Sequence, residues 1–203
     1  MNKLWPTLFS LLFLSSCVNN PEVEVLSKNQ LLLSYKQIEA VYNKDNGGWI
    51  EHLDFHKKRI FNAVKDTFPN SKHSYRLSPT SIHHDNESVI TKTFHDNPKL
   101  NVSSSVILKE NTLELNWWMK NSGLNTLEGR FKLQLELALD GTLSSEGTHS
   151  KLELDNGFNV TIEHDGKLKF EINNNKLIIS DLLPRSIDAL HRSSQKISFK
   201  FER

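Results

Sequence analysis

Apolar and polar residues alternate along most of the chain from Gln30 onward, which is the pattern of β-strands that bury one face. The clearest stretch covers residues 130–140. Its apolar positions fall on one face and are Phe131, Leu133, Leu135, Leu137 and Leu139. Lys132, Gln134, Glu136 and Ala138 fall on the opposite face. We therefore predict a strand with one face in a core and the other toward solvent.

The same period-two pattern predicts further strands at residues 88–94, 100–108, 113–119, 151–154, 158–164, 167–172, 176–180 and 196–202. Turn residues such as Asp140-Gly141 and Asp165-Gly166 separate them and suit hairpins. Only residues 182–192 resemble a helix. We predict an all-β fold, an antiparallel β-sandwich with at most one short helix. Its core should include the large apolar residues Trp49, Phe61, Phe68, Trp117, Ile197, Phe199 and Phe201.

The N-terminus has the pattern of an export signal. Lys3 precedes an apolar run that is too short to span a bilayer, and the run ends in Leu14-Ser15-Ser16-Cys17. This tetrapeptide resembles the lipobox of bacterial lipoproteins at all four positions. The resemblance implies cleavage before Cys17 and acylation of its sulfur and new amino terminus, which together anchor a protein stably. Cys17 is the single cysteine of the chain, so it has no intramolecular disulfide partner.

These features divide the chain into a signal peptide (1–16), a lipidated cysteine with a tether (17–29) and one β-sandwich domain (30–203). An ordinary secretory signal with an incidental cysteine is the alternative for the first part. Val18 is not the aspartate that retains many bacterial lipoproteins in the inner membrane. We therefore expect a protein of the bacterial cell envelope, anchored in the outer membrane and facing the periplasm.

Charge and motifs exclude several classes of function. Lys and Arg number 25 against 24 Asp and Glu, without a basic run, which does not fit a nucleic-acid-binding protein. Nucleotide-binding, metalloprotease and serine-hydrolase motifs are absent, so the sequence indicates no catalytic residue and no cofactor. His52 and His56 lie in a strand-and-turn region, and His83 and His84 point to opposite faces of an extended chain. We expect solvated histidines and no metal site.

Four short motifs follow one another between residues 30 and 140. They are Gly47-Gly48-Trp49-Ile50, Tyr75-Arg76-Leu77-Ser78-Pro79, Leu113-Glu114-Leu115-Asn116-Trp117 and Asn121-Ser122-Gly123. In this order they resemble the galactose-mutarotase-like supersandwich proteins. The resemblance implies a large antiparallel sandwich whose polar face meets carbohydrate, as an epimerase, an accessory domain of a glycosidase or a non-catalytic binder. The chain is much shorter than the catalytic epimerases and matches neither their catalytic histidine nor their glutamate motifs, so catalysis does not carry over.

Trp118 is the main candidate for ligand contact. Alternation places it on the polar face beside Glu114 and Asn116, where an indole can stack on a sugar while its neighbours bond hydroxyl groups. Gln134 and Glu136 join them if residues 130–140 pair with this strand. The alternative is that both faces of the strand are covered and the indole is packed.

We expect a lipid-anchored envelope protein that recognises carbohydrate or cell-envelope glycan. Two alternatives remain open. The first is a structural or assembly lipoprotein whose sheet face or edge strands bind a protein partner. The second is a divergent, epimerase-like enzyme that acts on sugars, for which Glu114 and Glu136 are the available carboxylates.

Overall fold

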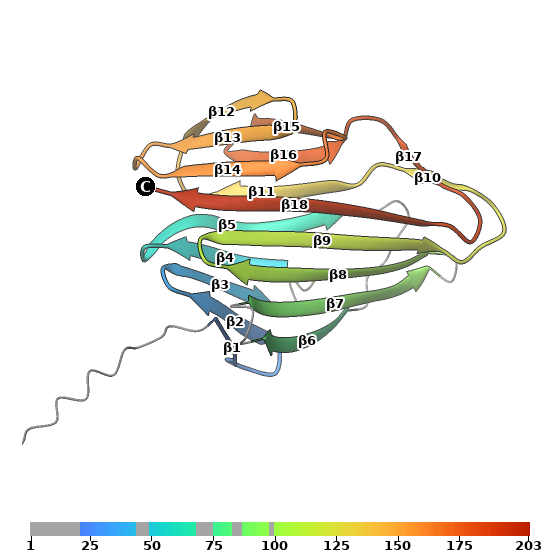
Figure 1. The fold of residues 1–203 in the computed structure, drawn as a ribbon, viewed down its shortest axis with the longest axis horizontal. Coiled ribbons are helices and arrows are strands. Elements are labelled where there is room, and N and C mark those ends of the chain that lie inside the picture. Colours follow the sequence, from blue (N-terminus) through green and yellow to red (C-terminus); the bar gives the residue numbers. More distant parts are fainter. Residues whose placement is uncertain (1–20, 44–48, 68–74, 83–86, 98–99) are drawn as a thin grey trace, which may run out of the picture.

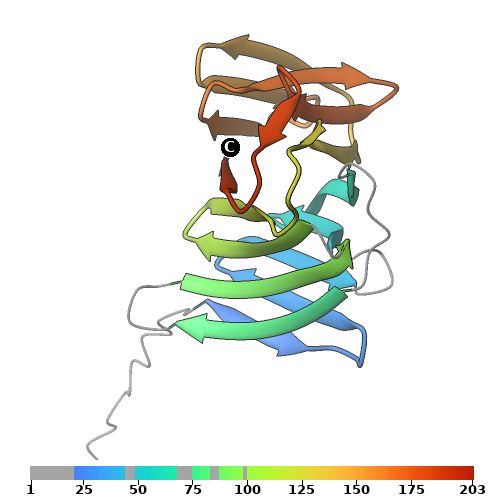
Figure 2. The same ribbon diagram turned by 90° about the vertical axis from the view of Figure 1, so that its right-hand side faces the viewer.

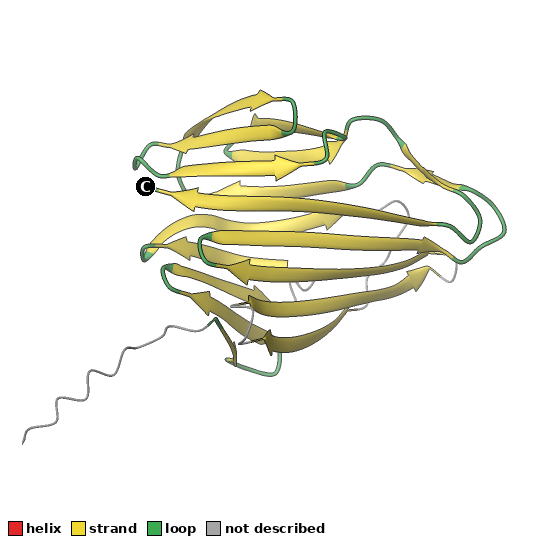
Figure 3. Cartoon of the chain, in the orientation of Figure 1, coloured by secondary structure: helices red, strands yellow, loops and turns green. Residues whose placement is uncertain are grey.

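The structure, a computed structural model, describes residues 21–43, 49–67, 75–82, 87–97 and 100–203, with side chains over 21–43, 50–62 and 105–203. These residues form eighteen β-strands joined by turns and loops (Figure 3). No helix long and apolar enough to cross a membrane occurs among the residues described. The predicted all-β class is confirmed.

Two eight-stranded antiparallel sheets lie face to face (Figures 1 and 2). Sheet A has the order β1-β2-β3-β4-β5-β11-β16-β15. Its strands are β1 (Glu22–Val25), β2 (Gln30–Tyr35), β3 (Ile38–Asn43), β4 (Trp49–Phe55), β5 (Lys58–Thr67), β11 (Lys132–Leu137), β16 (Lys176–Asp181) and β15 (Leu168–Asn173).

Sheet B has the order β12-β13-β14-β18-β9-β8-β7-β6. Its strands are β12 (Gly141–Glu146), β13 (His149–Leu154), β14 (Asn159–His164), β18 (Arg192–Glu202), β9 (Thr112–Asn121), β8 (Leu100–Lys109), β7 (Glu87–Asn97) and β6 (Tyr75–Ile82). The C-terminal strand β18 lies inside this sheet and pairs with β9 on one side and β14 on the other. It therefore joins the two halves of sheet B.

The core lies between the two sheets and follows the predicted alternation. On three central strands, the inward-facing apolar residues are at most 3% exposed. They are Leu113, Leu115, Trp117 and Met119 of β9, Leu133, Leu135 and Leu137 of β11, and Ile197, Phe199 and Phe201 of β18. Phe61 of sheet A meets Phe199 of sheet B edge to face, with ring centroids 6.2 Å apart. The predicted core positions at Phe61 and Trp117 are confirmed. Phe68 and the side chain of Trp49 lie outside the described residues.

The short helix predicted at residues 182–192 is wrong. Arg185–Ile187 form strand β17, which pairs with β10 (Leu127–Gly129) in a separate two-stranded sheet. Pro184 lacks an N–H donor and disfavours helical backbone at the residue before it. Leu190 has a φ of 63°, which also interrupts a right-handed helix.

The expected tether over residues 17–29 is also wrong in its second half. Glu22–Val25 pair with β2 in the register Glu22↔Ser34 to Val25↔Leu31, so sheet A begins before residue 30. The Glu-Val-Glu-Val sequence is itself a period-two pattern, and Val23 packs against the core. Cys17 and its neighbours up to residue 20 lie outside the described residues.

Asn121 gives the Asn121-Ser122-Gly123 motif a structural function. Its fully buried side chain donates hydrogen bonds of 2.8 Å to the carbonyl oxygens of Asn125 and Ile187, and it accepts one of 2.9 Å from the Gly123 amide. These bonds connect the end of β9 to the end of β17. The motif therefore fixes a loop and does not face a ligand.

The two faces of β11 provide a test of the one-sided burial. Leu135→Ala should lower the free energy of unfolding by about 2–5 kcal/mol, because it removes a side chain that is 1% exposed. Gln134→Ala, on the outward face, should change it by at most about 0.5 kcal/mol. Denaturant unfolding of residues 18–203, which contain every described strand, measures both. Equal losses would contradict burial of one face only.

Candidate functional site

The candidate residues from the sequence divide between the outer faces of the two sheets. Trp118, Asn116 and Glu114 lie on β9 and point out of sheet B, whereas Gln134 and Glu136 lie on β11 of sheet A. Gln134 and Glu136 would join the group on β9 only if residues 130–140 paired with that strand, and this condition is not met, because β11 pairs with β5 and β16. The structure does not bring the two groups together.

On the outer face of sheet B, Glu114 has Ile107 of β8 on one side and β18, followed by β14, on the other. Glu114 lies opposite Ser198, and Ser198 lies opposite Glu163, so the three residues form a row across adjacent strands. Lys196 and Lys200 flank this row along β18, since residues two apart on a strand share a face. Adjacent strands are about 4.8 Å apart, so all five side chains occupy one small area.

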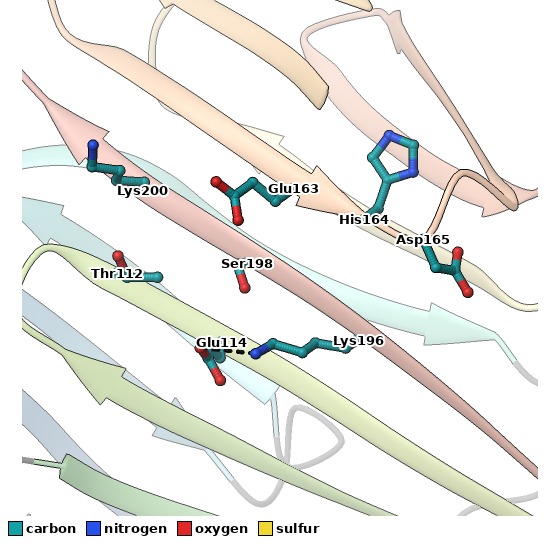
Figure 4. Close-up of a pocket in the computed structure, with 8 residues that line it drawn as sticks. All are labelled: Thr112, Glu114, Glu163, His164, Asp165, Lys196, Ser198 and Lys200. Atoms are coloured by element: carbon teal, nitrogen blue, oxygen red, sulfur yellow. Dashed lines mark ion pairs between the residues drawn. The ribbon is translucent and has the colours of Figure 1, made fainter. Parts of the chain in front are cut away.

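These residues line a shallow depression of about 470 Å³, which we call the central depression (Figure 4). Its lining consists of Thr112, Glu114, Glu163, His164, Asp165, Lys196, Ser198 and Lys200. Most of these groups are hydroxyl, carboxylate or ammonium groups, which donate or accept hydrogen bonds. The surface is therefore suited to a ligand that is rich in hydroxyl groups.

Both lysines of the central depression are paired with carboxylates. The Lys196 Nζ lies 3.0 Å from the Glu114 carboxylate, which is the ion pair drawn in Figure 4. The Lys200 Nζ lies 2.6 Å from the Glu202 carboxylate, and this hydrogen bond raises the pKa of Lys200. The pairing orients the charged groups and leaves no strong local excess of one sign.

His164 differs from the other lining residues because its ring points away from Ser198 and Lys196 (Figure 4). The ring packs on Phe170 with centroids 4.5 Å apart, and its Nδ1 accepts a 3.1 Å hydrogen bond from the Gly166 amide. Burial lowers the pKa of His164 and so favours the neutral ring. His164 thus supports the turn beside the depression.

Trp118 is 47% exposed, whereas Trp117 next to it is fully buried. In the ladders of sheet B, Trp118 lies opposite Ser194 of β18 and Ser103 of β8. The small side chain of Ser194 leaves the indole uncovered on the β18 side. Packing of the indole, the alternative considered from the sequence, does not occur in the structure.

The described residues contain no group of three or more His, Cys, Asp or Glu side chains placed to hold a metal ion. His52 lies on β4, and the ring of His56 contacts Phe55 with centroids 4.5 Å apart. His83 and His84 lie outside the described residues.

Of the residues that line the central depression, sequence reasoning singled out Glu114 and missed Thr112, Glu163, His164, Asp165, Lys196, Ser198 and Lys200. The sequence predicted strands at 158–164 and 196–202 and placed Ile197, Phe199 and Phe201 of the second one in the core. The missing information was that β18 pairs with β9 and that β14 pairs with the other edge of β18, because both strands come much later in the chain.

Comparison with solved structures identifies the fold. A protein from Synechocystis sp. PCC 6803 superposes with a TM-score of 0.67 at 8% identity, over 90% of this chain and 97% of the other. A galactose mutarotase-like protein from Clostridium acetobutylicum gives 0.63 at 8% identity, over 91% and 99%. The heparan sulfate lyase HepC from Pedobacter heparinus gives 0.59 at 11% identity, over 89% of this chain and 34% of the lyase.

The chain therefore has the galactose mutarotase-like β-sandwich fold, as the four sequence motifs predicted. At such low identities, the likeness extends to the fold alone. No protein-family model matches the sequence. No curated protein sequence is significantly similar to it either.

Proposed function

We propose that this protein is a lipid-anchored component of the bacterial cell envelope whose sheet B binds carbohydrate on its outer face. The observation that carries the proposal is the half-exposed indole of Trp118 beside a depression lined by hydroxyl and charged groups. An exposed Trp offers a flat apolar surface to the C–H groups of a sugar ring. Carboxylate, amide and hydroxyl groups nearby can bond the hydroxyl groups of the sugar.

Asn116 and Glu114 lie between Trp118 and the far end of the central depression on the same face of β9. A sugar that stacks on Trp118 therefore has polar partners along the same strand. Two structural neighbours carry names that refer to sugar chemistry, a galactose mutarotase-like protein and a heparan sulfate lyase. These names support the ligand class for a shared fold.

The proposed anchor rests on the lipobox at residues 14–17. Only residues 18–21 separate Cys17 from β1, so a lipid on Cys17 would hold sheet A within about 17 Å of the bilayer at full extension of the chain. The domain would then act at the membrane surface and not at a distance from it. The outer membrane is the proposed location, as expected from Val18.

A protein partner is the second candidate, and a separate observation favours it. Leu124 and Leu190 lie on neighbouring loops and are 88% and 63% exposed. A hydrogen bond of 3.1 Å from Thr126 to Asp188 joins these loops. Exposed leucines at the end of a rigid domain are suited to an apolar contact with another protein.

Replacement of Trp118 tests the carbohydrate proposal. Trp118→Ala should abolish binding to a glycan array and to envelope or plant polysaccharides in affinity electrophoresis. The circular dichroism spectrum and the melting temperature should change little, because the side chain lies outside the core. Trp117→Ala is the contrasting variant and should cost about 3–5 kcal/mol of stability.

Gln134→Ala is the matched control on the outer face of sheet A and should bind like the unmodified protein. Loss of binding in both Trp118→Ala and Gln134→Ala would indicate a general effect on the fold. If the unmodified domain binds no glycan, the carbohydrate proposal fails and the protein-partner candidate takes its place.

Replacement of Cys17 tests the anchor. The full chain expressed in a bacterium should fractionate with membranes and incorporate a palmitate analogue, whereas Cys17→Ala should do neither. Ser16→Ala is the matched control, since alanine also satisfies the lipobox, and it should be labelled normally. Equal labelling of the full chain and Cys17→Ala would contradict lipidation at this cysteine.

A further inference from the structure

A second depression of about 470 Å³ lies at the free edge of β18, and we call it the edge depression. It is lined by residues 166–167, 181–186 and 193–194. The ladder between β14 and β18 ends at the pair His164↔Ile197, so the segment of β18 before Ile197 extends past β14. The edge depression occupies this position.

Residues that line the two depressions are close neighbours along the chain at two places. Asp165 lines the central depression, and the next residue, Gly166, lines the edge depression. On β18, Lys196 lines the first and Ser194 lines the second, one strand repeat away. Trp118 is the cross-strand neighbour of Ser194, so its exposed indole lies beside the junction.

Arg185 makes the floor of the edge depression rigid. Its guanidinium donates hydrogen bonds to the Asp181 carboxylate at 2.6 and 3.2 Å, to the Ser193 hydroxyl at 2.8 Å and to the Gln195 side-chain oxygen at 2.9 Å. Asp181 also accepts a 2.8 Å bond from the Phe131 amide. The network ties β16, β17 and β18 together, so the depression is present before any ligand binds.

The charges that line the two depressions balance. Four carboxylates (Glu114, Glu163, Asp165 and Asp181) accompany four cations (Lys167, Arg185, Lys196 and Lys200). Lys196 and Arg185 are engaged in ion pairs with Glu114 and Asp181. A polyanionic glycan would need an excess of cations, so the surface is suited to an uncharged chain.

We infer that the two depressions form one groove for a neutral, linear oligosaccharide of several sugar residues, which stacks on Trp118 at the junction. This inference deepens the carbohydrate-binding function proposed above and rests on it. From Lys200 to Ser193 the groove follows β18 over about 23 Å at 3.3 Å per residue. A single sugar ring fills only a part of that length. Exposed Leu182 and Leu183 then border the far end of the chain of sugars.

Isothermal titration calorimetry of the lipid-free chain from residue 18 tests the groove with defined oligosaccharides. The probes are size series from monosaccharide to hexasaccharide, derived from chitin, cellulose and amylose, with heparin fragments of matched length. At least one neutral series should bind about tenfold or more tightly at the hexasaccharide than at the disaccharide. Heparin fragments should bind more weakly than that series.

Variants at the two ends of the groove locate the chain of sugars. Thr112→Val in the central depression and Leu183→Ser at the edge depression should each weaken hexasaccharide binding several-fold, with little effect on the disaccharide. Leu183 is 73% exposed, so its replacement should leave the fold intact. Leu124→Ser is the matched control, because this leucine is also highly exposed, at 88%, but lies outside the groove.

Three results would each contradict the proposed groove. They are an affinity that does not rise with oligosaccharide length, tighter binding of heparin fragments, and end variants that behave like Leu124→Ser. If all three neutral series fail while the glycan array detects another carbohydrate, the groove is wrong and the proposed function stands. If the array is also negative, the proposed function fails with it.

Discussion

The arrangement of this protein depends on the pairing of β18 with both β9 and β14. β18 lies inside sheet B and joins strands from two distant parts of the chain, with Thr112 opposite Lys200 and Val160 opposite Phe201. Because side chains alternate, one register places Phe199 and Phe201 in the core and Lys196, Ser198 and Lys200 on the outer face. A slip by one residue would exchange the two sets. The same ladder that buries the aromatic core therefore assembles the outer surface.

The strands and their faces could be predicted from the sequence because a half-buried strand carries its orientation in its own alternation. Leu133, Leu135 and Leu137 were placed inward and Trp118 outward on this basis, and the structure agrees. The neighbours of each strand could not be predicted in this way. Gln134 and Glu136 were to lie beside Trp118 and Glu114 if β11 paired with β9, but they lie on sheet A, and on sheet B Ser194 lies opposite Trp118 and Ser198 opposite Glu114. Pairing between distant strands depends on the whole topology, which local patterns do not encode.

Buried polar groups and surface polar groups have different roles in this domain. Asn121 and Asp181 are buried, and their hydrogen bonds hold the loops around β17 in place. Buried groups of this kind stabilise one arrangement, because each would be costly if left without partners. On the outer face, the Glu114–Lys196 pair remains accessible to solvent at its lysine. A surface ion pair contributes little to stability, so its groups remain available to a ligand.

Backbone amide NMR most directly tests whether the outer face of sheet B is the ligand face. The ¹⁵N-labelled chain from residue 18 would be titrated with the tightest-binding neutral oligosaccharide, and amide shifts would be mapped on the strands. We expect the largest changes on β9, β14 and β18, at residues 165–167 and in the Trp118 indole. Changes centred on β11 and β16, the outer face of sheet A, would contradict this account.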